Sequence, residues 1–318
     1  MGRKIPVIDI NNLFNIDLID QEDPEIQEIA NKFGLALHEN NGSVYLINHG
    51  IPEDMVSTAF AESKKFFELP AAIKTKYCKE DVIKNYHGYS AVEQERLSDT
   101  NRELKETFDI FGHDRYYPEE VPMFKEATES LEAACWKLQA KLLKLLAITI
   151  KLENIDLIND CARNCTDRTV PSLNSTRTAY YPPVSDDVIA GDIRCATHSD
   201  YGLLTLVFQD DIGGLEVQGP NEDWIPVTPI PGTIVVNTGD FFEKWTCGYF
   251  IATPHRVIIP EDEIKTKKCR QSFMSFSITD NSVYISPLRS EMLNKDYDFE
   301  PINPYEYAME KVKKSYGV

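Results

Sequence analysis

The sequence predicts a mainly β protein with flanking helices, in which many short strands form a sandwich or a barrel. Short β-type runs separated by Gly and Pro turns fill the chain from about residue 174 to residue 287. A long helical pattern precedes them, and strand-like and helical runs alternate at the start of the chain. Short strands at such spacing are typical of sandwiches and barrels. With 318 residues and no internal repeat or obvious linker, the chain is expected to form one compact unit.

The first part of the chain alternates strand and helix signals. Asp23-Pro-Glu25 combines an N-cap, a first-turn proline and an acidic side chain near the positive end of a helix. Gly42 ends the helical pattern that follows, and Leu69-Pro70 ends the next one. We expect strands over 5–10, 43–48 and 105–110, and helices over 23–40 and 52–68.

The longest helical pattern runs from about residue 118 to residue 152. Its apolar side chains, among them Leu131, Leu138 and Leu145, recur at helical spacing and form a wide face without an interrupting glycine. We therefore expect this helix to support a sheet rather than to carry a site.

The second half of the chain contains the β-type runs. Pro182-Pro183, Gly213-Gly214, Gly219-Pro220 and Pro231-Gly232 separate most of them. Strands are expected over 176–181, 196–209, 214–218, 224–227, 233–237, 252–259 and 271–279, with a last amphipathic helix over about 303–316.

Composition and charge limit the classes of partner. The formal net charge is −18, from 51 acidic and 33 basic residues. Such a surface repels nucleic acid and anionic membranes at long range. No apolar run reaches the length of a membrane span. We therefore expect a small-molecule partner, and neither nucleic acid nor membrane.

The cysteines predict a reducing compartment. There are seven, an odd number at irregular spacing, and no signal peptide precedes them. Free thiols fit this pattern best, so the cytoplasm is the expected location.

Two histidines and an aspartate have the residue types of a metal site. His198 and Asp200 stand two residues apart at a strand-like segment, so both project from one face, and His255 is the other histidine of the second half. Two imidazoles and one carboxylate are the ligands of the facial triad of non-haem Fe(II), which leaves positions open for O₂ and a co-substrate. Zinc accepts the same ligands, but its frequent His-Glu-x-x-His helix is absent. His49, beside Gly50, is interpreted as a turn histidine rather than a ligand.

A candidate anion site follows His255. Arg270 and Ser272 share one face of the last predicted strand, and a guanidinium with a neighbouring hydroxyl suits the far end of a dicarboxylate. Tyr180-Tyr181, on the first strand of the same region, places a phenol where it can reach that anion.

Motifs over most of the chain resemble the 2-oxoglutarate/Fe(II)-dependent dioxygenase superfamily, in its isopenicillin N synthase-like branch. The matching segments are Ile5-Pro-Val-Ile-Asp9, residues 44–52, Phe66-Phe-Glu-Leu-Pro70, Gly88-Tyr89, Lys105-Glu-Thr-Phe-Asp109, residues 198–206, Gly213-Gly-Leu-Glu-Val-Gln218, Asn237-Thr-Gly-Asp240, Thr253-Pro-His-Arg-Val257 and Arg270-Gln-Ser272.

The resemblance implies a fold, an activity and a set of site residues. It implies a double-stranded β-helix (jelly-roll) core over 173–285, wrapped by an N-terminal α/β region over 1–115, with a buttressing helix and connection over 116–172 and a helical tail over 286–318. It implies Fe(II) on His198, Asp200 and His255, and 2-oxoglutarate with its distal carboxylate on Arg270, Ser272 and Tyr181. The expected enzyme is a monomer that uses O₂ to oxidise, and most simply to hydroxylate, a small organic molecule. The keto acid leaves as succinate and CO₂, and ascorbate supports the activity.

Two departures and two alternatives accompany this interpretation. Ala179 stands where many members carry Asn, and residues 273–276 replace a commoner Ile-Pro-Phe-Phe run near the substrate. One alternative is an isopenicillin N synthase-type oxidase, which keeps the same motifs but does not use 2-oxoglutarate. The other is a non-catalytic binding protein on the same fold.

Overall fold

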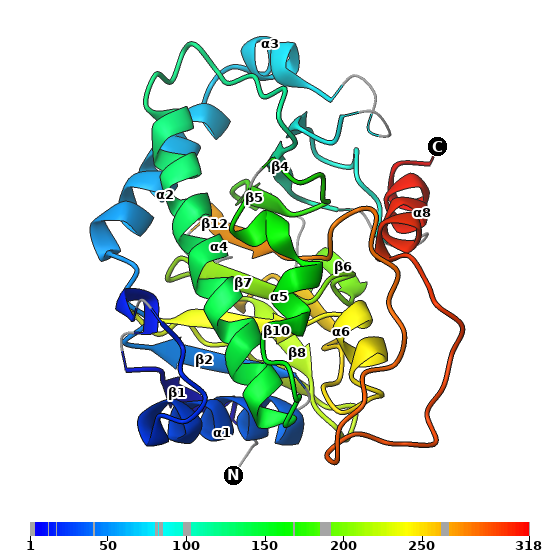
Figure 1. Ribbon diagram of the computed structural model, residues 1–318. Helices are drawn as coiled ribbons and strands as arrows, with labels where there is room; N and C mark the ends of the chain where they lie inside the picture. Colours follow the sequence, from blue (N-terminus) through cyan, green and yellow to red (C-terminus); the bar gives the residue numbers. More distant parts are fainter. Residues whose placement is uncertain are drawn as a thin grey trace.

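A computed structural model shows a β core with helices on its outside (Figure 1). The structure describes residues 4–11, 13–16, 18–40, 42–79, 82, 85–97, 103–167, 169–184, 192–261 and 267–317. The expected mainly β class with flanking helices is confirmed.

The core contains two sheets. The strands of the larger sheet are β1 (Val7–Asp9), β2 (Ser43–Ile47), β3 (Gly88–Ser90), β4 (Glu106–Phe111), β5 (Ser175–Tyr181), β7 (Leu204–Gln209), β10 (Ile234–Thr238) and β12 (Arg270–Phe276). Those of the smaller sheet are β6 (Ile193–His198), β8 (Leu215–Gln218), β9 (Trp224–Pro226) and β11 (His255–Ile258). The orders are β1-β2-β10-β7-β12-β5-β4-β3 and β6-β11-β8-β9, and β1–β2 is the parallel pair.

The sheets enclose an apolar interior. Alternate residues of each strand face inward, so Tyr45, Val207 and Val235 of the larger sheet meet Val217 and Val257 of the smaller one, and all five are buried. The first part of the chain provides four strands of the larger sheet, β1, β2, β3 and β4. They lie in the same sheet as β5, β7, β10 and β12.

The helices lie outside the sheets. They are α1 (Pro24–Glu39), α2 (Glu53–Phe67), α3 (Ala71–Lys74), α4 (Phe124–Thr149), α5 (Leu157–Cys161), α6 (Asp240–Trp245) and α8 (Pro304–Tyr316), with 3-10 turns at Leu13–Asn15, Thr75–Tyr77 and Arg163–Cys165. As expected, Asp23 caps α1 by accepting a hydrogen bond from the Glu25 amide at 2.9 Å.

Helix α4 supports the larger sheet, as the sequence predicts, although it begins at Phe124 rather than near residue 118. Its Gln139 amide nitrogen donates to the carbonyls of Leu204 on β7 (3.1 Å) and Ser275 on β12 (2.9 Å). Helix α1 crosses α4 at Gly34, where a Cβ atom would lie 2.2 Å from the Thr149 hydroxyl. A glycine is therefore required at this close approach.

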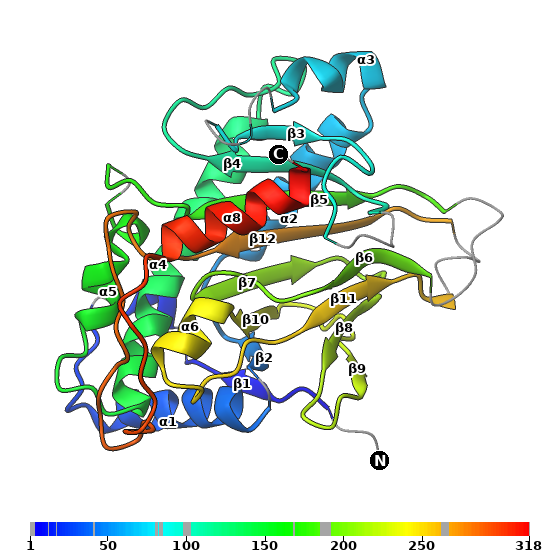
Figure 2. The same ribbon diagram turned by 90° about the vertical axis from the view of Figure 1, so that its right-hand side faces the viewer.

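In the view of Figure 2, helix α8 passes in front of β5 and β12. Asn303 caps it through the Glu306 amide at 3.2 Å, and its C-terminal end is tied to the N-terminal region by a hydrogen bond from the Arg96 amide to the Ser315 carbonyl at 2.7 Å. Among the described residues, no helix is both long enough and apolar enough to cross a membrane.

The prediction of one continuous strand over residues 196–209 is wrong. The run 196–209 divides into β6, which ends at His198 in the smaller sheet, and β7, which begins at Leu204 in the larger one. The intervening turn carries Asp200, so the division places this carboxylate between the two sheets. Helix α6, directly after β10, was not expected.

Candidate functional site

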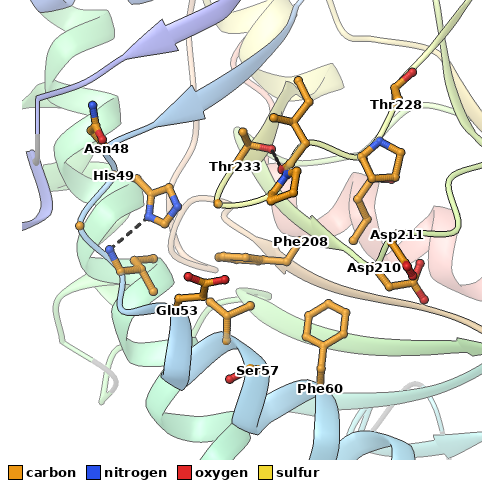
Figure 3. A pocket seen from close by; sticks show the side chains of 18 of the residues that line it. Asn48, His49, Glu53, Ser57, Phe60, Phe208, Asp210, Asp211, Thr228 and Thr233 are labelled. Atoms are coloured by element: carbon orange, nitrogen blue, oxygen red, sulfur yellow. Dashed lines mark hydrogen bonds between the residues drawn. The ribbon is translucent and has the colours of Figure 1, made fainter.

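A cleft of about 980 Å³ lies apart from the predicted metal ligands (Figure 3). Its wall includes Phe60, Phe208 and His49. The His49 ring accepts a hydrogen bond from the Ile51 amide at 3.1 Å through Nδ1, and burial lowers the pKa of this histidine. His49 is therefore the turn histidine that the sequence predicts.

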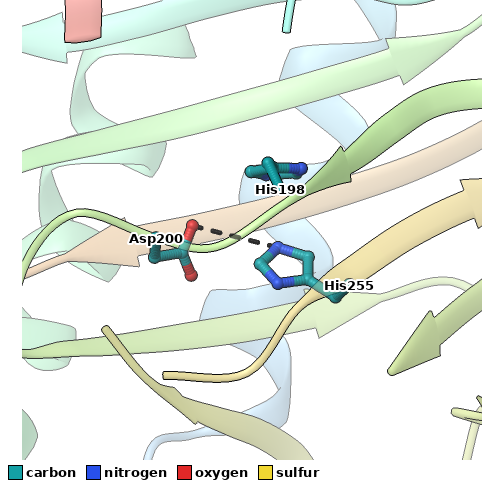
Figure 4. Close-up of side chains that lie close together, drawn as sticks. All are labelled: His198, Asp200 and His255. Carbon is teal, nitrogen blue, oxygen red and sulfur yellow. Dashed lines mark ion pairs between the residues drawn. The ribbon is translucent and has the colours of Figure 1, made fainter. Parts of the chain in front are cut away.

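The two predicted histidine ligands and the aspartate converge at one end of the space between the sheets (Figure 4). His198 ends β6 and His255 begins β11, and these residues are direct partners in the antiparallel pair. One ligand-type atom from each of His198, Asp200 and His255 lies within 4.8 Å of the other two. We call these three residues the His-Asp-His group.

Backbone carbonyls orient both imidazoles. Nδ1 of His198 lies 2.9 Å from the Ala196 carbonyl, and Nδ1 of His255 lies 2.9 Å from the Thr253 carbonyl. Each ring therefore donates through Nδ1 and leaves Nε2 as the free acceptor. Nε2 of His255 faces Asp200, at 3.9 Å from Oδ1. Burial, and next the neighbouring His198, lower the pKa of His255, which favours the neutral ring that binds metals.

Backbone contacts fix the position of Asp200, while its carboxylate keeps one oxygen without a hydrogen-bond partner among the described residues. The Asp240 amide donates to the Asp200 carbonyl at 2.8 Å, and a Cβ on Gly239 would lie 2.9 Å from that same carbonyl. Oδ2 of Asp200 is buried and has no hydrogen-bond partner among the described residues. An orphaned carboxylate oxygen beside two free imidazole nitrogens fits a divalent metal ion.

An inner cavity of about 60 Å³ joins the His-Asp-His group to Arg270. Arg270 is 1% exposed, and its guanidinium donates to the Gly213 carbonyl (2.6 Å) and lies 3.4 Å from the Ser272 hydroxyl. The ring of Tyr181 stacks against this guanidinium, with 4.7 Å between Cζ and the ring centroid. Arg270 forms no ion pair with a carboxylate of the described residues. A buried guanidinium without a direct ion pair is suited to an anionic ligand.

The structure thus brings all six predicted site residues to the wall of one cavity: Tyr181, His198, Asp200, His255, Arg270 and Ser272. They come from β5, β6, β11, β12 and the turn after β6.

An outer pocket of about 290 Å³ opens on the other side of the His-Asp-His group. Leu97, Arg177 and Phe276 line both this pocket and the inner cavity. Tyr86, Tyr201 and the α8 residues Ala308, Met309 and Val312 complete much of its wall. The outer pocket is therefore lined by residues of the 86–97 stretch, by strand residues and by α8.

The sequence did not predict a buried group of paired charges beside the outer pocket. We call it the paired charge cluster, which consists of Lys79, Glu95, Glu103, Lys105, Asp109 and Arg177. Arg177 donates from Nη1 to Glu95 (2.9 Å) and from Nε to Asp109 (2.7 Å). Lys79 pairs with Asp109 at 2.7 Å, and Lys105 pairs with Glu103 at 2.9 Å. The sequence signal that could have predicted this cluster is the presence of charged residues inside β-type runs, such as Asp109 and Arg177.

The cationic side chains of this cluster lower the pKa of the Glu95 carboxyl group. Burial by itself would raise the pKa of Glu95, but Arg177, Lys105 and Lys79 outweigh burial and hold it well below its ordinary value. The cluster has three cationic and three anionic side chains, so it places no net charge beside the outer pocket.

Fold and site together define a class of protein: a β-sandwich core with an interior His-Asp-His metal-type group and a buried anion site. Two family models match the chain: the 2OG-Fe(II) oxygenase superfamily over residues 173–278 and the N-terminal region of a non-haem dioxygenase in morphine synthesis over residues 5–131.

Curated relatives and solved structures agree with the family models. The proline hydroxylase buaE of Petromyces alliaceus is 32% identical over 69% of this chain and 71% of its own length. The 2-oxoglutarate-Fe(II) type oxidoreductase ppzD of Metarhizium rileyi is 29% identical over 87% of this chain and 83% of its own length. A full-length Neurospora crassa protein, solved in complex with alpha-KG and thymine, superposes with a TM-score of 0.83 at 26% identity, covering 98% of this chain and 97% of its own.

The chain belongs to the 2-oxoglutarate-Fe(II) oxygenase superfamily. It is a 2-oxoglutarate-dependent non-haem Fe(II) dioxygenase with the double-stranded β-helix core of that superfamily, as the resemblance of its motifs implied. Fe(II) and 2-oxoglutarate are its cofactor and co-substrate.

Proposed function

We propose that the His-Asp-His group binds Fe(II) and that Arg270, Ser272 and Tyr181 hold the distal carboxylate of 2-oxoglutarate. One observation carries this proposal: a single inner cavity has metal-type ligands with free lone pairs at one end and an unpaired buried guanidinium at the other. A dicarboxylate that spans the cavity satisfies both ends.

Contacts within the chain orient the proposed ligand-binding side chains before either ligand binds. The Ala196 and Thr253 carbonyls fix the two imidazoles, so each presents Nε2 without a change of rotamer. The Gly213 carbonyl and the Tyr181 ring orient the Arg270 guanidinium, and its Nη1 and the Ser272 hydroxyl, 3.4 Å apart, form the proposed contact for a carboxylate. Bound in this site, Fe(II) supplies the redox chemistry that couples O₂ and the keto acid to oxidation of a C–H bond, with succinate and CO₂ as products.

The outer pocket is the proposed substrate site. Its volume of about 290 Å³ suits a small organic molecule, and it shares His198 and Asp200 with the inner cavity. Leu97 and Phe276 stand between the two spaces and keep water away from the reacting atoms. We include hydroxylation of the substrate in the proposal. A relative named as a proline hydroxylase and a neighbour solved with thymine support a small cyclic substrate.

The proposal also includes a monomer in the cytoplasm that uses neither nucleic acid nor membrane. All seven cysteines are free in the structure, which fits a reducing compartment. The net charge of −18 opposes binding to polyanions. The molar mass of the protein, measured by light scattering after size-exclusion chromatography, tests whether it is a monomer. The mass of a dimer would contradict that part of the proposal.

The direct test measures succinate formed from 2-oxoglutarate with Fe(II), O₂ and ascorbate. We expect slow turnover by the protein alone and faster turnover when a substrate from a panel of cyclic amino acids and nucleobases fills the outer pocket. A protein that retains Fe(II) but never consumes the keto acid would instead be an oxidase of the isopenicillin N synthase type. A protein that retains neither Fe(II) nor Mn(II) would be a non-catalytic binding protein.

A further inference from the structure

Asn237 is a buried amide in the wall of the inner cavity that the proposed site does not yet use. It lies on β10 and is 1% exposed. In the register of the larger sheet it stands opposite Ser43 of β2 and Thr205 of β7. It shares the inward face of β10 with Val235, two residues earlier. Among the described residues, Asn237 is the side-chain amide that lines this cavity.

The neighbours of Asn237 satisfy one end of its amide and leave the other end open. The Ser43 hydroxyl donates to Oδ1 of Asn237 at 2.8 Å, and the same hydroxyl lies 3.2 Å from the Thr253 hydroxyl. Nδ2 of Asn237 is buried and has no hydrogen-bond partner among the described residues. A buried donor without a partner destabilises a fold, and native proteins keep few of them. The open nitrogen therefore indicates a ligand atom that accepts a hydrogen bond.

The strand register places Asn237 at the metal end of the cavity. Asn237 is paired with Thr205, which is paired in turn with Phe276 of β12. Ser272, at the anion end, stands four residues earlier on β12, which is roughly 13 Å along a strand. Two residues after Asn237, Gly239 approaches the Asp200 carbonyl closely. The open amide nitrogen thus belongs to the end of the cavity that the His-Asp-His group occupies.

The chemistry of the co-substrate identifies the acceptor. 2-Oxoglutarate has two carboxylates, and the proposed function assigns one of them to Arg270. Its other carboxylate, beside the keto group, then lies at the metal end. We propose that Asn237 is a further co-substrate-binding residue, whose Nδ2 donates a hydrogen bond to the carboxylate beside the keto group of 2-oxoglutarate. This inference rests on the proposed function. A neutral amide gives a charge-assisted hydrogen bond there without adding a charge that competes with the metal.

The test compares two ligands that differ only at this carboxylate. The second ligand is 4-oxopentanoate, which keeps the keto group and the distal carboxylate but has a methyl group in place of the other carboxylate. Calorimetric titrations use the full chain loaded with Mn(II), which takes the same ligands as Fe(II) without turnover. Asn237→Leu removes both donors at similar size, and we expect it to raise the Kd for 2-oxoglutarate about tenfold or more. We expect the Kd for 4-oxopentanoate to change less than about twofold, because that ligand has no acceptor at this end.

Two further variants separate a lost hydrogen bond from a damaged fold. Asn237→Asp replaces donors by an anion and is expected to weaken 2-oxoglutarate binding more than Asn237→Leu does. Thr176→Val is the matched control, because this Thr is fully buried on β5, has an unpartnered hydroxyl and does not line the cavity. Its Kd for 2-oxoglutarate should equal that of the unchanged protein.

Thermal unfolding gives an independent measurement. Without ligand, Asn237→Leu should unfold near the Tm of the unchanged protein, while the rise in Tm caused by 2-oxoglutarate should shrink. If Asn237→Leu does not fold, Asn237→Ser takes its place in both measurements. Equal losses of affinity for both ligands, or no loss for either, would overturn the role of Asn237. Failure of the unchanged protein to bind 2-oxoglutarate would instead contradict the proposed function.

Discussion

Two groups of buried charges lie side by side in this protein and differ in how they are neutralised. Every member of the paired charge cluster has an oppositely charged protein partner, as in the Arg177–Glu95 and Lys79–Asp109 pairs. In the inner cavity, by contrast, Asp200 keeps an unpartnered buried oxygen, and Arg270 has no ion pair among the described residues. The two groups share a wall, since Arg177 and Lys105 also line the inner cavity.

This difference separates structural charges from ligand-binding charges. A buried ion destabilises a fold unless another group compensates it, and in the cluster the protein itself compensates each charge. In the inner cavity the direct partners would come from outside the chain, as a cation beside Asp200 and an anion beside Arg270. Burial alone does not identify a site, because both groups are buried. The absence of a protein partner identifies it.

The largest expected effect comes from substitutions in the His-Asp-His group. His198→Ala and Asp200→Ala each remove one of three ligands, so we expect succinate formation to fall to the level of metal-free protein. Metal content and keto-acid turnover are the measurements. His49→Ala, which changes a histidine in the separate cleft, is the control and should retain both. Full activity in either ligand variant would contradict the metal assignment.

The next effect concerns the anion end of the same cavity. Arg270→Met removes the buried guanidinium, and we expect the Kd for 2-oxoglutarate to rise about 100-fold, because loss of one partner of a buried charge pair costs several kcal/mol. Titration of the Mn(II)-loaded protein measures it, and the affinity for Mn(II) alone should not change. An unchanged Kd for 2-oxoglutarate would place the anion site elsewhere.

In the paired charge cluster, a substitution should affect stability more than ligand binding. Arg177→Met leaves Glu95 and Asp109 buried with fewer partners, so we expect the free energy of unfolding to fall by about 3–5 kcal/mol. Urea unfolding measures it. Arg289→Met breaks the exposed Arg289–Asp298 pair (3.0 Å) and should cost no more than about 1 kcal/mol. Equal losses in these two variants would remove the distinction drawn between buried and exposed pairs.

The smallest expected effect is a pH dependence of stability. The pKa of Glu95 is lowered in the folded protein, so its ionised form contributes stability above the ordinary carboxyl pKa of about 4.3, and this contribution is lost as the pH falls toward the folded value. The difference in unfolding free energy between the unchanged protein and Glu95→Gln should therefore be full at pH 7 and shrink below about pH 4. A difference that grows under acid would contradict the charged state assigned to Glu95.

Much of the fold follows from local patterns. Helices α1, α2 and α8 and most strands lie where their caps, turn residues and periodicity predict them. The errors arose where neighbours in sequence separate in space. The run 196–209 has one continuous β pattern, yet its halves pair with β11 and β10 in different sheets. The division of the chain at residues 115, 172 and 285 stays a prediction.

The sequence by itself determined which kinds of ligand this protein offers: two imidazoles, an aspartate and an arginine with a nearby hydroxyl, at strand-like positions and within family motifs. Only the tertiary structure decided which charges are paired and which remain open. The members of the paired charge cluster lie up to 98 residues apart, from Lys79 to Arg177, and Asn237 meets Ser43 across 194 residues. Periodicity reports which face of a strand a side chain occupies. The partner across that face depends on long-range strand pairing, which neighbouring residues do not encode.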